Sequence, residues 1–205
     1  SGGFETRDGF MKPGQDIIMA GWTGYEGCVR IAEKNREMLE KRFSPMFLDT
    51  LDQSPWDEEN TDTKDRTVRD WLTGVLAEKN SPVTAWEYAG EGGILAALWN
   101  LSGIYNAGID VDLRLFPMKQ ITVELCELFE LNPYRLLCGD CAVFAAWGGS
   151  ALVRQLKQAG IPAAVIGIVI PGIARKIRHG EESAGYLERP QPDELKKVIL
   201  QEPDR

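Results

Sequence analysis

The sequence VTAWEYAGEGGILAAL, residues 83–98, is the stretch that most strongly determines the expected fold. Residues 83–88 fit a β-strand, and three glycines at positions 90–93 predict a tight turn. Beyond the turn, apolar side chains recur at helical spacing, at Ile94, Leu95, Leu98, Leu101 and Tyr105. The stretch therefore predicts a strand, a glycine-rich turn and a helix in direct succession.

The same order of elements recurs further along the chain. Residues 142–146 fit a short strand, glycines 148–149 open a helix with Ser150 as its expected N-cap, and residues 163–170 fit a buried strand. The first unit is also followed by a strand, at residues 109–113, whose apolar and acidic side chains alternate. We interpret these segments as two similar strand–turn–helix–strand units within one sheet, not as a repeat array.

The remaining segments continue the alternation of strands and helices. A helix is expected after Gly24 and Gly27, running to Phe43, with Pro45 as the signal that stops it. Further strands are expected at residues 16–22 and 173–178, and further helices at residues 68–76, at 121–129 and, as a short final element, from residue 192. This pattern predicts an α+β fold with a mixed β-sheet covered by helices.

We expect one domain with short extensions. Residues 1–14 are expected to be a linker, residues 15–200 the domain, and residues 201–205 a tail. Residues 49–63 carry six acidic residues within a segment that contains Ser54-Pro55, which predicts a solvated loop.

Composition narrows the class of protein. The 205 residues are 43% hydrophobic and 26% charged, and a chain of this length can bury a sizeable core. The net charge of −8 argues against nucleic acid or an anionic membrane as a partner, because both attract basic surfaces. The longest apolar stretch, residues 159–174, is too short for a spanning helix and contains two prolines. No signal peptide is visible, so we expect a cytoplasmic protein.

The four cysteines are too sparse for a disulfide scaffold. Cys28 and Cys126 lie in helical patterns and are expected to be core residues. Cys138 and Cys141 have the spacing of a tight turn, of a redox pair or of half a zinc site. A zinc site would need two further ligands, and His179 is the only histidine, so no metal site is predicted.

The glycine turn, Gly90–Gly93, is the best candidate for chemistry. A glycine-rich turn at a helix start exposes unpaired N–H groups, to which the helix dipole adds positive charge, so a phosphate could bind there. Glu91 would oppose an anion unless Mg²⁺ bridged the two. The alternative is a packing turn that needs glycines for close backbone approach. Glu87, just before the turn, is a possible general base or an ordinary strand-edge carboxylate.

Several motifs together resemble the C-terminal domain of the aminoimidazole ribonucleotide (AIR) synthase-related, or PurM-like, superfamily. The motifs occur in the family's order, at residues 12–18, 24–27, 91–98, 106–112, 131–136, 159–161 and 163–167. The resemblance covers roughly residues 10 to 200, and the hydrogenase maturation factor (HypE-like) branch is the most similar.

The resemblance implies a fold and a function. Such proteins have two domains and dimerise through the N-terminal one, which holds most of the ATP and magnesium site. The C-terminal domain closes over that site and helps to form the pocket for a small-molecule substrate, on which ATP activates an oxygen by phosphorylation. It follows that ATP and Mg²⁺ belong to the full-length parent, that an N-terminal domain is missing here, and that the present chain is not catalytic alone.

Two departures from the family pattern bear on the site. The family's strand-end motif, approximately His-Asp-Val-Thr-x-Gly-Gly, corresponds here to residues 87–93, in which Glu87, Tyr88 and Gly90 replace the His, Asp and Thr. The C-terminal cysteine of the hydrogenase maturation branch is also absent from the end of this sequence. The candidate substrate- or phosphate-binding residues are therefore Glu87, Tyr88, Gly90, Glu91, Gly92 and Gly93, with the catalytic residues unassigned. The rival hypothesis is a non-catalytic binding or regulatory module, and a more remote one is an independent enzyme that uses Cys138 and Cys141.

Overall fold

A computed structural model describes residues 8–51 and 67–199 of the chain. Most of the expected acidic loop, the first half of the expected linker and the expected tail lie outside the described residues. Within residues 8–14, the Phe10 N–H donates to the Thr84 carbonyl oxygen and the Gly14 N–H donates to the Val169 carbonyl oxygen, both at 3.0 Å.

Seven strands in the described part of the chain form one sheet. They are β1 (Asp16–Ala20), β2 (Val83–Tyr88), β3 (Gly108–Asp112), β4 (Ala142–Ala146), β5 (Ala163–Ile170), β6 (Arg175–His179) and β7 (Ser183–Tyr186). Their order is β2-β4-β1-β5-β3-β6-β7. The β3–β6 pair is parallel and the other neighbouring strands are antiparallel. The expected mixed sheet is confirmed, and both strand–turn–helix–strand units contribute to it.

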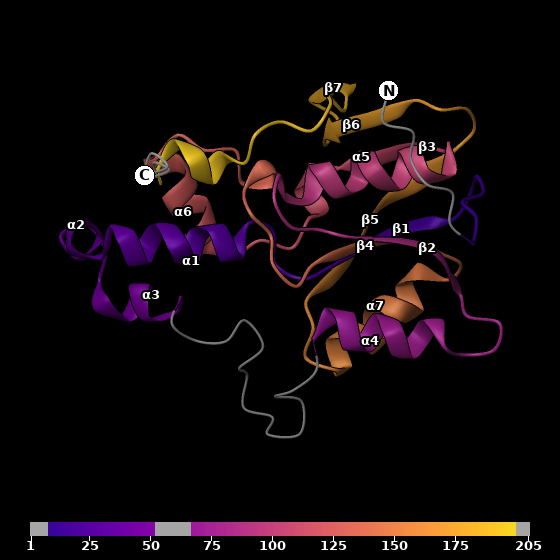
Figure 1. The fold of residues 1–205 in the computed structure, drawn as a ribbon, viewed down its shortest axis with the longest axis horizontal. Coiled ribbons are helices and arrows are strands. Elements are labelled where there is room, and N and C mark those ends of the chain that lie inside the picture. Colours follow the sequence, from indigo (N-terminus) through magenta and orange to yellow (C-terminus); the bar gives the residue numbers. More distant parts are fainter. Residues whose placement is uncertain (1–7, 52–66, 200–205) are drawn as a thin grey trace, which may run out of the picture.

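Helices cover the sheet on both faces (Figure 1). α5 (Gly93–Tyr105) lies on one face, and α4 (Val68–Leu76) and α7 (Gly149–Gln158) lie on the other. A third group packs at one end of the sheet, consisting of α1 (Tyr25–Lys34), α2 (Arg36–Glu40), α3 (Pro45–Asp49) and α6 (Gln120–Leu128). Three short 3₁₀ helices complete the described elements, at Leu113–Leu115, Pro133–Arg135 and Glu194–Lys197.

The continuous apolar run of β1 reflects burial on both faces of the sheet. Ile17 and Met19 pack in the α5 cluster, whereas Ile18 and Ala20 pack in the cluster beneath α4 and α7. All four side chains are fully buried. Strand side chains alternate between faces, so a strand with a core on each side is apolar at every position.

Two helix boundaries differ from the expectation. The helix predicted to run to Phe43 is broken at Asn35, whose φ of −115° and ψ of 20° depart from helical values. Its backbone N–H and its side-chain amide both donate to the Ile31 carbonyl oxygen, at 3.0 and 2.9 Å. Pro45 starts α3 instead of only ending a helix, because the first helical position needs no N–H donor. The Ser44 hydroxyl caps α3 by accepting the Phe47 N–H at 3.2 Å.

Ser150 was expected to cap α7, and this is wrong. Gly148, at φ +66°, is the N-cap, and Ser150 lies within the first turn. The Asp16 carboxylate accepts the Gly149 N–H at 2.8 Å, so a distant strand residue supplies the cap. Strand β7 was not predicted, since its four residues are all exposed and show no alternation. Within the described residues, none of the helices combines the length and apolar character needed to cross a lipid bilayer.

Candidate functional site

The candidate residues meet other parts of the chain where three neighbouring strands, the edge strand β2 and then β4 and β1, begin or end. Tyr88, the last residue of β2, pairs with Ala142, the first residue of β4, and Ala142 also pairs with Ala20 at the end of β1. Just beyond these strands, the Ala89 N–H donates to the Cys141 carbonyl oxygen at 2.9 Å and the Cys138 N–H donates to the Gly90 carbonyl oxygen at 3.2 Å. The glycine turn and the cysteine turn, Cys138–Cys141, thus lie side by side, and we call this region the strand-end site.

The two side chains that precede the glycine turn face opposite sides of the sheet. Tyr88 packs with the cluster under α4, as does Trp86, whereas Ala85 belongs to the α5 cluster. Because strand residues alternate, Glu87 lies on the α5 side. Its carboxylate accepts the Tyr88 N–H at 3.2 Å. The six candidate residues fall within seven consecutive positions, 87–93, but they do not all line one pocket.

Close packing explains the second half of the glycine turn. Gly93 has φ +76°, and a Cβ at this position would lie 2.5 Å from the Tyr134 carbonyl oxygen and 2.7 Å from the Arg135 Cα. Gly92 has φ +86°, which side chains rarely adopt. A Cβ on Gly90 would meet nothing within 4 Å. The turn therefore needs glycine at its helix end and tolerates a side chain at its strand end.

A carboxylate of this chain already binds the start of α5. Asp193 is 4% exposed, and its Oδ2 accepts the Gly92 N–H at 2.7 Å. Its Oδ1 accepts the N–H groups of Leu137 at 3.1 Å and Leu195 at 2.9 Å. Beside it, Glu91 is exposed and pairs with Lys196 at 3.1 Å. We call the three bonds of Asp193 the Asp193 clasp, which places a negative charge where the sequence suggested a phosphate.

Sequence reasoning missed the clasp. The sequence around Asp193 predicts only the start of a final helix, and Asp193 does cap that 3₁₀ helix through Leu195. Its bond to Gly92 spans 101 positions in the sequence. Nothing in the local pattern around Asp193 indicates such a partner.

The cysteine turn joins the glycine turn to α4. Cys138 and Cys141 are buried and are paired as a disulfide. Between them Asp140, at φ +47°, directs its carboxylate at the first turn of α4. Its oxygens accept the Val68 N–H at 3.1 Å and the Arg69 N–H at 3.4 Å. The pair thus occupies a tight turn, and residues 8–51 and 67–199 contain no group of three or more His, Cys, Asp or Glu side chains that could hold a metal ion.

The other two cysteines are core residues, as expected. Cys28 and Cys126 are buried in the cluster of α1 and α6. Burial raises the pKa of each thiol to about 12, so neither is a thiolate at neutral pH. Neither of these thiols is therefore a candidate for nucleophilic chemistry.

A cavity of about 390 Å³ opens between the cysteine turn and α4. Its lining residues are Thr67, Arg69, Tyr88, Ala89, Asp140 and Cys141. The Arg69 guanidinium carbon lies 3.8 Å from the centroid of the Tyr88 ring, which is a cation–π contact. We call this the Arg69 cavity, and of the predicted site residues it includes Tyr88.

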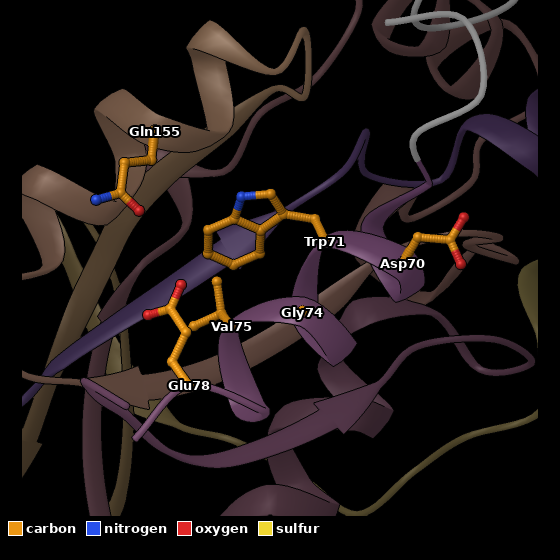
Figure 2. Close-up of a pocket in the computed structure, with 6 residues that line it drawn as sticks. All are labelled: Asp70, Trp71, Gly74, Val75, Glu78 and Gln155. Atoms are coloured by element: carbon orange, nitrogen blue, oxygen red, sulfur yellow. The ribbon is translucent and has the colours of Figure 1, made fainter. Parts of the chain in front are cut away.

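A second cavity, of about 440 Å³, lies between α4 and α7 and shares no lining residue with the first. Figure 2 shows the Trp71 indole near its middle, with the side chains of Glu78 and Gln155 extending toward the same space and Asp70 pointing away. The Trp71 ring also packs on Phe144, at 6.0 Å between centroids, so it contributes to the core. With the Glu78 carboxylate extending into it, this cavity does not suit an anion.

The fold is that of the AIR synthase-related, PurM-like proteins, so the resemblance noted in the sequence is confirmed for the fold. Among solved structures, HypE from E. coli, a hydrogenase maturation protein, is 20% identical with a TM-score of 0.67, over 95% of this chain and 56% of that one. HypE solved in complex with ATP is 13% identical with a TM-score of 0.66, over 95% and 55%. Thiamine monophosphate kinase from Aquifex aeolicus is 16% identical with a TM-score of 0.53, over 91% and 55%.

These similarities establish the fold alone, because the sequence identity to each of the three structures is at or below 20%. A scan of protein-family models gives no match, and a search of curated proteins gives none either. The chain spans a little over half the length of these three solved proteins.

Proposed function

We propose that this chain is the C-terminal, substrate-side domain of a cytoplasmic ATP-dependent protein of the AIR synthase-related type, and that it needs a second domain for catalysis. In this proposal the parent protein binds ATP with Mg²⁺ mainly through the N-terminal domain, through which it also dimerises. ATP would supply the phosphoryl group that activates an oxygen of a small-molecule substrate. The present chain would contribute one wall of the substrate pocket.

One observation carries the proposal. Nearly the whole chain superposes on a little over half of a HypE structure that was solved with ATP. The convergence of the glycine turn, the cysteine turn and the end of β2 is the second support, because loops at strand ends are where such folds place ligands. We assign substrate contacts to the strand-end site, with Glu87, Tyr88 and the Gly90–Gly93 turn as its first candidates.

A specific observation favours the rival, a non-catalytic module that retains the fold. The Gly92 N–H, which a phosphate would need, is already bonded to Asp193. Glu87, Tyr88 and Gly90 also stand where the family resemblance implies His, Asp and Thr. A module that had lost its pocket would show both features.

Calorimetric titration of the complete protein with Mg-ATP separates the two proposals. An ATP-dependent enzyme gives a saturable heat that disappears when Mg²⁺ is chelated, and it releases phosphate or ADP when its substrate is supplied. A protein that gives no heat with Mg-ATP at millimolar concentration is the non-catalytic module. The control is the same titration with a nucleoside that lacks phosphates.

A further inference from the structure

The Arg69 cavity offers a better site for an anion than the glycine turn does, because the glycine turn lacks a free inward-facing donor. At the glycine turn the inward-facing Gly92 N–H is bonded to a buried carboxylate, so a second anion there would meet both an occupied donor and a like charge. In the Arg69 cavity, a guanidinium lies at the wall. Among the residues that the structure describes, no carboxylate forms an ion pair with Arg69.

Stacking on Tyr88 orients that guanidinium without using its donors. A guanidinium lying over an aromatic ring is held by its face, and its N–H edge stays free for a planar pair of hydrogen bonds. The Arg69 guanidinium carbon lies over the Tyr88 ring at 3.8 Å from its centroid, which is close enough for such stacking. The Thr67 hydroxyl, which accepts the Asp70 N–H at 3.0 Å, keeps its own proton for a ligand at the same wall.

Among the described residues that line the cavity, Asp140 is the one with an acidic side chain. Its two carboxylate oxygens accept the Val68 and Arg69 N–H groups, which lie at the positive end of α4. These bonds offset part of the carboxylate charge and point it at the helix. The other charged side chain among the described lining residues is Arg69.

We propose that the Arg69 cavity binds the phosphoryl group of a phosphorylated small molecule, with Arg69 as the anion-binding residue, Tyr88 as its stacking support and Thr67 as a hydroxyl donor. The proposal deepens the proposed function and rests on it, since it names the chemical class of the substrate. It also gives a role to Tyr88, which replaces the acidic residue that the family resemblance implies at this position.

The test is titration of the complete protein with inorganic phosphate and with pyrophosphate, in which binding is measured by ³¹P NMR or by calorimetry. We expect Arg69→Ala to weaken binding by about ten-fold or more, because it removes a charge-assisted pair of hydrogen bonds. Arg69→Lys should recover only part of the affinity, and Tyr88→Phe should bind nearly as the parent does. Tyr88→Leu should weaken binding, because the guanidinium loses its support. Arg154→Ala, on the exposed side of α7, removes the same charge elsewhere and is the matched control.

Circular dichroism and thermal unfolding verify that each variant folds. The inference is overturned if the parent binds neither probe, or if Arg69→Ala binds both as tightly as Arg154→Ala does. Mg-ATP titration in parallel separates failure of the Arg69 site from failure of the proposed ATP-dependent function. Normal Mg-ATP binding with no effect of Arg69→Ala on phosphate removes this inference alone, whereas absence of Mg-ATP binding removes the proposed function.

Discussion

Replacement of Asp193 by Asn should destabilise the domain strongly, although the two side chains have the same shape. The carboxylate accepts three N–H groups while 4% exposed. An Asn side chain has one oxygen, which can keep the bonds from Leu137 and Leu195. Its NH₂ group would then face the Gly92 N–H, so two donors would oppose each other in a buried place.

The size of the effect follows from that geometry. One hydrogen bond to a charged acceptor is worth about 1.5–3 kcal/mol, and a buried donor left without a partner costs a further 1–3 kcal/mol or so. We expect Asp193→Asn to lower the free energy of unfolding by about 3 kcal/mol. For a domain of this size, that lowers Tm by about 6–12 °C.

Urea unfolding followed by circular dichroism measures the change, and the transition midpoint should fall without a change in slope. Glu188→Gln is the control, because it neutralises an exposed carboxylate on the same C-terminal segment. Asp193→Asn within about 0.5 kcal/mol of the parent would refute the reasoning, since surface substitutions alone produce changes of that size.

Three further predictions follow from the strand-end site and its surroundings. Gly93→Ala should cost more than about 3 kcal/mol of folding stability or prevent folding, because its Cβ would collide with backbone atoms, whereas Gly90→Ala should change stability by less than about 0.5 kcal/mol; urea unfolding of the pair is the measurement. Burial would raise the pKa of Asp112, but N–H groups of Gly180 and Arg114 outweigh it and hold the pKa below its ordinary value of 3.8. The stabilisation by Asp112 is therefore present above pH 3.8 and lost as the pH falls further, so the stability difference between the parent and Asp112→Asn should shrink below that pH; equal differences at pH 6 and pH 3 would contradict it. Maleimide labelling with mass spectrometry should find two reactive thiols in unfolded, unreduced protein and four after reduction, and four before reduction would show that the disulfide is absent.

The fold could be predicted from sequence where a local pattern has one explanation. The change from strand to glycine turn to helix at residues 83–105 contains its own boundaries, and β2 and α5 lie there. The double-sided burial of β1 follows from an unbroken apolar run. In contrast, Ser150 has the composition of an N-cap, but the cap comes from Asp16 on β1, which the sequence around α7 cannot reveal.

The candidate site was predictable only in part, for the same reason. Three glycines among four consecutive residues predict a tight turn. The structure adds that Gly93 is needed because its backbone packs against that of Tyr134 and Arg135, which the spacing of the glycines does not reveal. The partners that define the chemistry come from distant segments, namely Asp193 on the turn and Arg69 on the Tyr88 ring. Such contacts depend on how helices dock, and hydrophobic periodicity does not encode them.

The Gly90 carbonyl oxygen accepts two N–H groups, from Gly93 at the start of α5 and from Cys138 in the cysteine turn. Asp140 continues the chain of bonds to the first turn of α4, on the opposite face of the sheet. The starts of α5 and α4 are therefore connected through a few short hydrogen bonds. A displacement of one helix start must be transmitted to the other or break a link, so the layers above and below the sheet cannot adjust independently at this end of the molecule.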